Sequence, residues 1–486
     1  MNLKEDLKTG VFYTALAKFA GVFITLGVSA VLARLFTPEE FGVINIATVF
    51  IAFFSVFSDF GLGPAVIQRR DLTKEDISGV FSLTVWTAAV LSLIFLAAAF
   101  PIAGYYGGSR ELRVVLMILT ANLFFNTLNM VPNALLMKEK RFKFAAIRQL
   151  AVQIVCGTAA IVAALLGMGI YALTINPVCS SIIIFIINYS QYPVRPRFSP
   201  GKETIGKVLG FSAFQFGFQL VNYFSRNLDK LLMGRHMSMT ELGYYDKSYR
   251  LMMMPLQNIS YVLSPVMHPV LAQIQDDKEH IAQAYIRVIK LLAYIGFPLT
   301  AAMYFMSSDL ILFFFGNQWG PSVPCFRILS LSVAIQIISS SSGSVFQASN
   351  DTKRLFGAGI FSAVTIITAI CIGMFVFHTM EWVAGCLCIA YAINFLQCYY
   401  SLLLKSLGHG WKEFWKTLVK PSLLCILLAG VLWLVQRSIS GVSNHFVALC
   451  IYTVVTLAVT LAWVQVTGEY ELMTKIKNIL CRLRKH

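Results

Sequence analysis

Two apolar stretches lie near the middle of the chain, at residues 207–233 and 241–270. Beyond the first residue of each, they contain four basic and two acidic residues that could bind a charged ligand. A charge near the middle of a membrane-spanning helix costs on the order of 2.5 to 3.5 kcal/mol, so such a group needs partners, a water-filled cavity or both. The two acids leave the group net positive. The planar fork of arginine suits phosphate because it donates two parallel hydrogen bonds. We therefore predict that these residues bind a multiply charged anion such as a diphosphate.

Helical spacing predicts which of these side chains face the same way. Residues three and four apart are neighbours on a helix, so the polar residues of each stretch form one face, with Asp246 within reach of Arg250. The residues concerned are Asn222, Arg226, Asp229 and Lys230 in the first stretch and Asp246, Lys247 and Arg250 in the second. An alternative is that the two aspartates only neutralise their neighbours and hold helices together.

Two further charges lie in apolar stretches closer to the amino terminus. Lys18 lies within residues 11–33, and Asp59 lies within residues 42–66 beside a cluster of glycine and proline. Asp59 is either a structural partner of Lys18 or, like the other aspartates, a group that takes up a coupling proton or cation. The predicted cavity cations are thus Lys18, Arg226, Lys230, Lys247 and Arg250, and the predicted polar or coupling residues include Asp59, Asn222, Asp229 and Asp246.

A stripe of small polar residues runs along the apolar stretch 322–348. Gln336, Ser340 and Ser344 fall on one side of a single predicted helix. Small polar residues let membrane helices pack closely, and the same residues would also suit a hydrophilic wall for a sugar headgroup. The sequence leaves both interpretations open.

Membrane helices are the elements that must position these residues. About 20 apolar residues span roughly 30 Å of hydrocarbon. A content of 57% hydrophobic and 13% charged residues excludes a soluble domain of 486 residues. We predict an all-α polytopic membrane protein with 14 transmembrane helices, near 11–33, 42–66, 78–103, 112–136, 144–166, 168–190, 207–233, 241–270, 284–308, 322–348, 355–378, 381–404, 416–436 and 444–467.

Lysine and arginine are concentrated in alternate connections between these stretches. The two termini and the even-numbered loops hold 25 of them and the odd-numbered loops hold five, which places both termini in the cytoplasm by the positive-inside rule. Four others, at the ends of stretches, are expected to extend to the membrane interface: Arg148, Arg287, Lys290 and Arg327. This distribution also argues against a nucleic-acid patch, despite a net charge of +16.

The first twelve stretches form two similar sets of six. Arg34, Thr37, Glu40 and Gly42 recur at a constant offset as Arg235, Ser238, Glu241 and Gly243. Parallel repeats of this kind are related by an axis along the membrane normal. We predict two six-helix lobes with pseudo-twofold symmetry plus two extra helices, divided into residues 1–190, a cytoplasmic linker at 191–206, residues 207–405, and residues 406–486 with a basic cytoplasmic tail.

Other chemistries have little support in the sequence. The ten cysteines are scattered without metal-ligand or disulfide spacing, so no metal site is predicted. Residues 201–207 resemble a phosphate-binding loop, but Val208 replaces the Ser or Thr that would bind Mg²⁺. No cofactor or ATP coupling is predicted. Residues 11–33 are too long for the core of a signal peptide and are interpreted as a retained first helix.

Several motifs resemble those of one known family. Residues 35–42 (LFTPEEFG), 59–68 (DFGLGPAVIQ) and 229–245, which include DKLLMGR and LGYY, look like the Wzx-type polysaccharide exporters of the multidrug/oligosaccharidyl-lipid/polysaccharide superfamily, in the branch similar to the colanic acid exporter. The resemblance implies a two-lobed bundle that flips undecaprenyl-diphosphate-linked oligosaccharide across the bacterial inner membrane by alternating access. It also implies cations in a central cavity and, as partners, bilayer lipids, a polysaccharide polymerase and a chain-length regulator.

Two other functions were weighed against this one. A drug or cation antiporter of the same superfamily would need an acidic or apolar cavity, whereas the predicted cavity is basic. A membrane glycosyltransferase or polymerase would need a sizeable extramembrane domain, and the longest predicted connection has about 16 residues. We therefore expect a transporter and not an enzyme.

Overall fold

The computed structural model describes residues 3–58, 63, 66–67, 72–196, 212–272, 277–439 and 444–468. Throughout these residues the secondary structure is helical, and the chain divides into two compact units, Met1–Asp246 and Lys247–His486. The boundary falls inside one helix, α11. The predicted division into two six-helix lobes, a linker and two extra helices stays a prediction.

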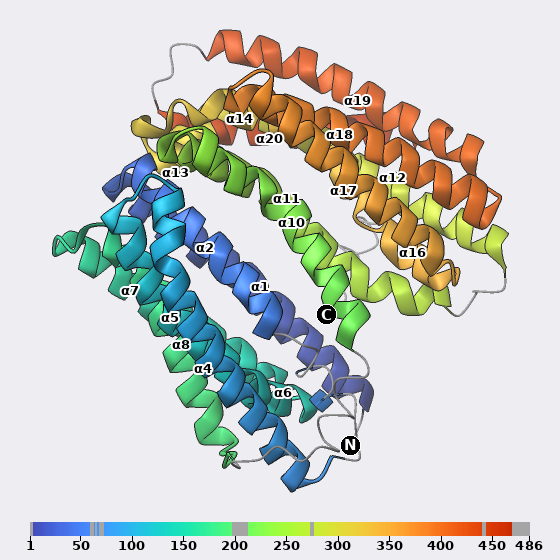
Figure 1. The fold of residues 1–486 in the computed structure, drawn as a ribbon. Coiled ribbons are helices and arrows are strands. Elements are labelled where there is room, and N and C mark those ends of the chain that lie inside the picture. The colour runs from blue at the N-terminus through green and yellow to red at the C-terminus, as the bar shows by residue number, and fades with distance from the viewer. Residues whose placement is uncertain are drawn as a thin grey trace, which may run out of the picture. The chain divides into compact units, whose positions relative to one another are not determined.

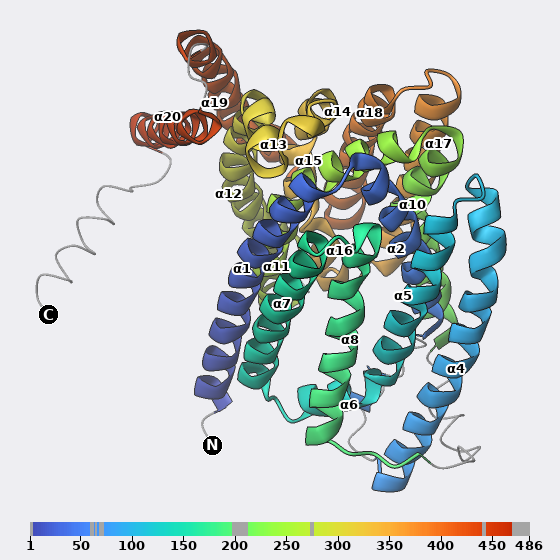
Figure 2. The ribbon, with the colours of Figure 1, turned by 90° about the vertical axis from the view of Figure 1, so that its left-hand side faces the viewer.

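The first unit contains long helices that follow one another along the chain (Figure 1). Within it α4 packs beside α5, α1 beside α7 (Figure 2), and α10 beside α2. Its helices are α1 (Leu3–Leu35), α2 (Pro38–Ser58), α4 (Lys74–Tyr105), α5 (Arg110–Leu128), α6 (Met130–Lys138), α7 (Phe142–Leu165), η1 (Gly169–Tyr171), α8 (Ala172–Gln191), α10 (Ser212–His236) and the start of α11 (Met239–Ala272).

The second unit contains the rest of α11 and the helices that follow it. In this unit α17 packs beside α18, and α19 packs beside α12. The helices are α12 (Lys278–Phe305), α13 (Ser307–Phe315), η2 (Asn317–Trp319), α14 (Ser322–Ser330), α15 (Val333–Ser339), α16 (Ser342–Ala348), α17 (Thr352–Phe375), α18 (Met380–Tyr399), the π-helix η3 (Tyr400–Leu407), α19 (Trp411–Ser438) and α20 (His445–Val466).

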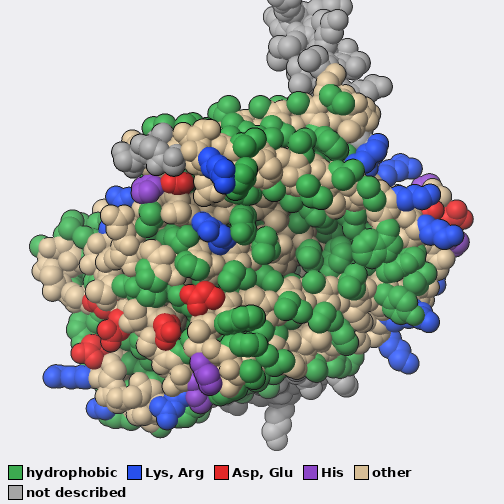
Figure 3. Space-filling view, turned by 90° about the horizontal axis from the view of Figure 1, so that it is seen from above, with side chains coloured by type: hydrophobic (Ala, Val, Ile, Leu, Met, Phe, Trp, Pro, Cys, Tyr) green, Lys and Arg blue, Asp and Glu red, His purple; other side chains and the backbone are tan. Residues whose placement is uncertain are grey.

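The protein is a multi-pass membrane protein. Eleven of the described helical segments are long and apolar enough to cross a bilayer, or twelve if the bent pair α14 and α15–α16 forms one span. Hydrophobic side chains are spread over the face seen in Figure 3, as expected of a surface that meets lipid. α10 and α11 are not apolar enough to be counted among these segments, although both are long helices at positions where membrane spans were predicted.

Residues 322–348 do not form the single straight helix predicted from the sequence. The segment breaks after Ser330 and again after Ser339, and its two main parts differ in direction by 47°. The hydroxyl groups of Ser330, Ser332 and Ser340 each donate to a carbonyl oxygen three residues earlier in the chain. Such local bonds compete with the regular helical pattern, which accounts for interruptions in a serine-rich segment.

The last two long helices, α19 and α20, pack against other helices of the second unit and also expose apolar surface. Leu424, Leu428 and Tyr452 are buried in one cluster with Tyr294 of α12. At the start of α20, His445 Nδ1 lies 2.8 Å from Asp309 Oδ1 of α13. Outward-facing residues of α19 and α20 such as Ile426, Leu434 and Val454 remain exposed and suit contact with lipid acyl chains.

The repeated motif forms equivalent helix starts in α2 and α11. Glu40 N donates to Thr37 Oγ1 at 3.3 Å, and Glu40 Oε2 accepts from Thr37 N at 2.8 Å. Ser238 and Glu241 make the same two bonds, at 3.1 and 3.0 Å. Each is a capping box, which satisfies backbone donors at the first turn of a helix.

The glycines of the repeat bring these two helix starts into direct contact. A Cβ atom on Gly42 would overlap the backbone carbonyl oxygen of Met239, and one on Gly243 would overlap that of Pro38. Because Met239 and Pro38 occupy equivalent positions in the two copies, the contact is reciprocal. Only glycine permits this approach, since any side chain would displace one backbone from the other.

Replacing either glycine by alanine should therefore destabilise the first unit. We expect Gly42→Ala and Gly243→Ala each to cost about 1–3 kcal/mol, the usual penalty for overpacking. The measurement is the melting temperature of the purified protein in detergent. Gly104→Ala is the control, because its added Cβ would meet no other residue within 4 Å. Equal melting temperatures for Gly42→Ala and the control would show that the close contact carries no energetic weight.

Candidate functional site

The charged residues of α10 and the start of α11 form a paired cluster in the first unit. Lys230 Nζ of α10 lies 3.1 Å from Asp246 Oδ1 of α11, and both side chains are largely buried. Asp229 Oδ2 accepts a hydrogen bond of 2.7 Å from the hydroxyl of Tyr245, and Asp229 Oδ1 accepts one of 2.8 Å from the backbone N–H of Lys230. The two aspartates thus hold α10 and α11 together, and Asp246 is paired with Lys230 on the neighbouring helix.

Packing of α10 against α2 fixes the position of this cluster. The hydroxyl of Tyr223 donates to the carbonyl oxygen of Val49 at 3.0 Å, and that of Tyr106 donates to the carbonyl oxygen of Leu231 at 3.0 Å. Gly234 packs closely against Ile46 and Tyr106, where a Cβ would overlap the Ile46 side chain. These contacts keep α10 in a defined rotation, so its charged residues have defined directions.

Lys247 occupies a different environment, in the second unit. Its side chain is 4% exposed, and its Nζ atom lies 5.0 Å from the ring centroid of Phe315 and 5.4 Å from that of Trp319. A cation over an aromatic face is attracted by the electrons of the ring. The hydroxyl of the next residue, Ser248, donates to the carbonyl oxygen of Ser322 at 2.9 Å. Lys247 is therefore a buried cation held by aromatic rings.

The remaining predicted cations are exposed on their own units. Lys18 of α1, Arg226 of α10 and Arg250 of α11 all have exposed side chains. Asp59 lies outside the described residues, and Asn222 lies on α10 in a part whose side chains are not described. The predicted roles of all these residues in ligand binding stay predictions.

The predicted polar stripe is divided by the breaks in residues 322–348. Gln336 Nε2 donates to Ser332 Oγ at 2.7 Å and lies 3.5 Å from the sulfur of Met252. Ser340 falls in the break between α15 and α16, and Ser344 lies on α16. Ser340 and Ser344 are both half-buried. The 47° bend comes before Val333, so Gln336, Ser340 and Ser344 lie on the same side of it, and their role as one polar stripe stays a prediction.

A second polar network, which was not predicted from the sequence, lies in the first unit. Arg148 of α7 is 8% exposed and does not extend to the interface as expected; its Nη1 atom donates to Asn188 Oδ1 of α8. Asn188 Nδ2 in turn donates to Asn129 Oδ1, between α5 and α6, at 2.7 Å. The signal in the sequence is a row of asparagines at helical spacing on α5 and α6: Asn122, Asn126, Asn129 and Asn133.

Comparison with known proteins gives one consistent result. A family model described as "Polysaccharide biosynthesis protein" matches residues 31–324. The chain is 22% identical over 433 residues to the lipopolysaccharide biosynthesis protein WzxC of Escherichia coli (strain K12), covering 88% of this chain and 87% of that protein. The resemblance to Wzx-type exporters predicted from the motifs is confirmed.

Solved structures with the same fold are transporters. The structure titled "Lipid II flippase MurJ, inward closed conformation" matches with a TM-score of 0.77 at 17% identity, covering 94% of this chain and 98% of that one. An inward-facing multidrug resistance MATE family transporter of the MOP superfamily matches with a TM-score of 0.59 at 15% identity, covering 79% of this chain and 94% of that one. At these identities the likeness concerns the fold alone.

The Lys230–Asp246 pair makes a stability prediction. Asp246→Ala leaves Lys230 buried without this partner, and breaking a buried pair costs about 3–5 kcal/mol. We expect a clear fall in the melting temperature of Asp246→Ala and a substantial recovery in Lys230→Met/Asp246→Ala, because the double variant removes the uncompensated charge. A double variant no more stable than Asp246→Ala would contradict the pairing.

Proposed function

The chain belongs to the family of polysaccharide biosynthesis proteins, and from this premise we propose that it is a flippase for undecaprenyl-diphosphate-linked oligosaccharide repeat units. It moves these units across the bacterial inner membrane for assembly of a surface polysaccharide such as O-antigen, capsule or exopolysaccharide. The observation that carries the proposal is the excess of cations on α10 and α11, two long helices in an otherwise apolar protein.

The exposure of the side chains in the cluster indicates which cations would bind the diphosphate. Lys230 is engaged by Asp246, and Lys247 is buried against Phe315 and Trp319. Arg226 and Arg250 have exposed side chains. A guanidinium donates two parallel hydrogen bonds to one phosphate, so two arginines match the two phosphates of a diphosphate. We assign these two arginines the main binding role and Lys18, Lys230 and Lys247 a supporting one.

The proposed transport cycle is alternating access between two six-helix lobes with pseudo-twofold symmetry, plus two extra helices. The two capping boxes and the reciprocal glycine contact support this symmetry. α10 and α11 complete the proposed set of 14 spans. Their polar faces would be costly in lipid, so we place these faces toward a water-filled central cavity, together with Gln336, Ser340 and Ser344.

The distribution of charge in the sequence suggests both how the protein is oriented in the membrane and what supplies the energy for transport. The 25-to-five distribution of basic residues over the termini and loops supports an orientation with both termini in the cytoplasm. One elementary charge crossing 100 mV is worth about 2.3 kcal/mol. A proton or cation taken up at Asp59, Asp229 or Asp246 would supply free energy on this scale for resetting the cavity. A polymerase and a chain-length regulator are the proposed partners downstream.

The two alternative functions fit the site less well. The fold itself does not separate a flippase from a drug or cation antiporter, because solved transporters of both kinds match it. A site for cationic drugs needs an acidic or apolar lining, whereas the charged residues of α10 and α11 are net positive. A membrane glycosyltransferase or polymerase would need an extramembrane domain, and among the described residues helices are joined by short connections.

Removal of the two exposed arginines tests the proposal. Arg226→Ala/Arg250→Ala should abolish surface polysaccharide and cause a lipid-linked saccharide to accumulate in the membrane, because the diphosphate loses its main hydrogen-bond donors. The measurements are surface polysaccharide on whole cells and mass spectrometry of extracted lipids. Immunoblotting of the membrane fraction checks that the variant still inserts.

The matched control removes two exposed arginines at helix ends. Arg110 and Arg437 are exposed near the start of α5 and the end of α19. Arg110→Ala/Arg437→Ala changes the net charge by the same amount and should leave export near the wild-type level. Normal surface polysaccharide in Arg226→Ala/Arg250→Ala would refute the cationic binding site.

A further inference from the structure

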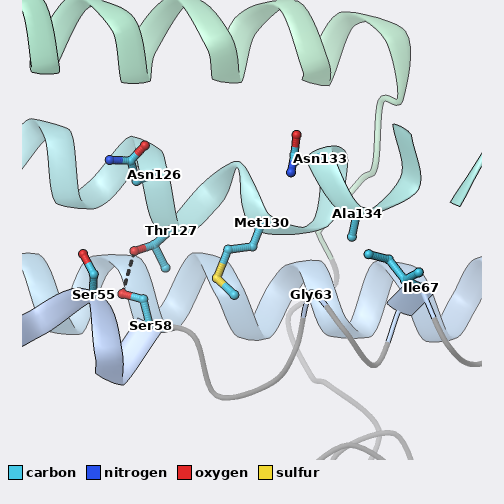
Figure 4. Close-up of a pocket in the computed structure, with 9 residues that line it drawn as sticks. All are labelled: Ser55, Ser58, Gly63, Ile67, Asn126, Thr127, Met130, Asn133 and Ala134. Carbon is cyan, nitrogen blue, oxygen red and sulfur yellow. Dashed lines mark hydrogen bonds between the residues drawn. The ribbon is translucent and has the colours of Figure 1, made fainter. Parts of the chain in front are cut away.

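A pocket of about 350 Å³ lies within the first unit, between the end of α2 and the junction of α5 with α6 (Figure 4). Ser55 and Ser58 come from α2, and Asn126 and Thr127 come from the last turns of α5. Among the described residues the lining is Ser55, Ser58, Gly63, Ile67, Asn126, Thr127, Met130, Asn133 and Ala134. It contains none of the charged residues assigned to diphosphate binding.

A proline creates the helix junction that forms one wall of the pocket. Pro132 has no backbone N–H, so the carbonyl oxygen of Leu128 loses the hydrogen bond that a regular helix would give it. α5 accordingly ends at Leu128 and α6 begins at Met130. The interruption is local, because Asn129 keeps helical dihedral angles and residues 110–138 still form one candidate span.

Buried hydrogen bonds hold both walls in place. The hydroxyls of Ser58 and Thr127 lie 2.9 Å apart and join α2 to α5. On the other side of the junction, Asn129 accepts from Asn188, which accepts from Arg148. A connected network of this kind restricts the orientation of the junction. The pocket is therefore a preformed feature of this unit, and Arg148 acts on it through Asn188 and Asn129.

The described part of the lining is polar but uncharged, and it combines donors with acceptors. Hydroxyl and carboxamide groups both donate and accept hydrogen bonds. Asn126 is exposed and donates to Asn122 Oδ1, and Ser55 and Asn133 are half-buried, so these polar groups remain accessible. Ile67, Met130 and Ala134 add apolar surface. A ligand that fits must carry hydroxyl groups at its edges and carbon–hydrogen surface on its faces.

We propose that this pocket binds a sugar ring of the saccharide carried by the lipid-linked substrate, an inference that rests on the proposed function. A pyranose has hydroxyl groups around its rim and apolar faces, which match the two kinds of lining. A phosphate would require cationic donors, and the described lining residues include no Lys or Arg. The volume is at the lower end of the range for small-molecule sites and far exceeds the shell of one ion.

The position of the pocket along the chain agrees with loading from the cytoplasm. Asn133 is five residues before Lys138, in a loop that the charge pattern predicts to be cytoplasmic. At 1.5 Å per residue this is about 7.5 Å along the helix axis. A sugar attached to a lipid diphosphate lies on the aqueous side of the headgroup, so a site near this end of the span is reached at the start of the transport cycle.

Binding of matched lipids to the full chain in nanodiscs tests the inference. The probes are undecaprenyl diphosphate and the same lipid carrying glucose, galactose or N-acetylglucosamine, with affinity measured by native mass spectrometry. We expect at least one glycosylated lipid to bind about tenfold more tightly than the bare lipid, the effect of two additional hydrogen bonds. In Ser55→Ala/Asn133→Leu this preference should fall below about twofold, because the change removes one hydroxyl and one carboxamide from the lining.

The control for folding is Ser82→Ala. Ser82 is a buried hydroxyl on α4 that donates to the carbonyl oxygen of Ser78 and does not line the pocket. This variant should keep the wild-type preference, and circular dichroism should show equal helicity for all three proteins.

Three outcomes would overturn the inference, and they are distinguishable from failure of the proposed function. Equal binding of bare and glycosylated lipids by the wild type would show that the pocket does not recognise sugar. An unchanged preference in Ser55→Ala/Asn133→Leu would place sugar recognition elsewhere. Binding that responds to Na⁺ in place of K⁺, with no sugar preference, would identify an ion site. Failure of the bare lipid to bind would instead refute the proposed function.

Discussion

The need to stabilise charged side chains within apolar helices is the constraint on which the rest of this structure depends. The charged groups of α10 and the start of α11 are stabilised by different means: Lys230 by Asp246, Asp229 by the Tyr245 hydroxyl, and Lys247 by two aromatic rings. Each of these contacts needs a partner on a neighbouring helix or segment. A buried charge without such contacts costs several kcal/mol. The charged residues that make α10 and α11 too polar for a simple apolar span therefore also bind these helices to their neighbours.

The reciprocal glycine contact provides the geometry that the ion pair needs. Gly42 and Gly243 let the starts of α2 and α11 meet at backbone distance, and two capping boxes define where each helix begins. Tyr223 holds α10 against α2, and Tyr106, at the end of α4, donates to the carbonyl oxygen of Leu231 in α10. Lys230 and Asp246 then face each other because both helices are held in fixed rotation. A short repeated motif thus has a structural role that is separate from ligand binding.

The proposed function divides recognition of one substrate between two kinds of chemistry. Exposed arginines suit the diphosphate, which is common to all substrates of this class, whereas a neutral polar pocket suits the saccharide, which differs from one substrate to another. The two sets of residues do not overlap in the chain. Sugar selectivity would therefore change through Ser55, Asn126 or Asn133 without altering the charge on which lipid binding depends.

Hydropathy along the sequence was enough to predict the helical class and the approximate limits of the long helices, because both depend on local composition. The family was predicted from the resemblance of short motifs. The pairing of Asp246 with Lys230 across two helices was not predictable from spacing on one helix, and spacing favoured Arg250 instead. Arg148 was expected at the interface, since the sequence does not show that Asn188 and Asn129 surround it. The bends in residues 322–348 also escaped prediction, because hydropathy does not record where serine hydroxyls interrupt a helix. Composition determined that this chain forms membrane helices; tertiary packing alone decided which charges are paired, because a side chain's partner depends on the rotation and approach of the neighbouring helix.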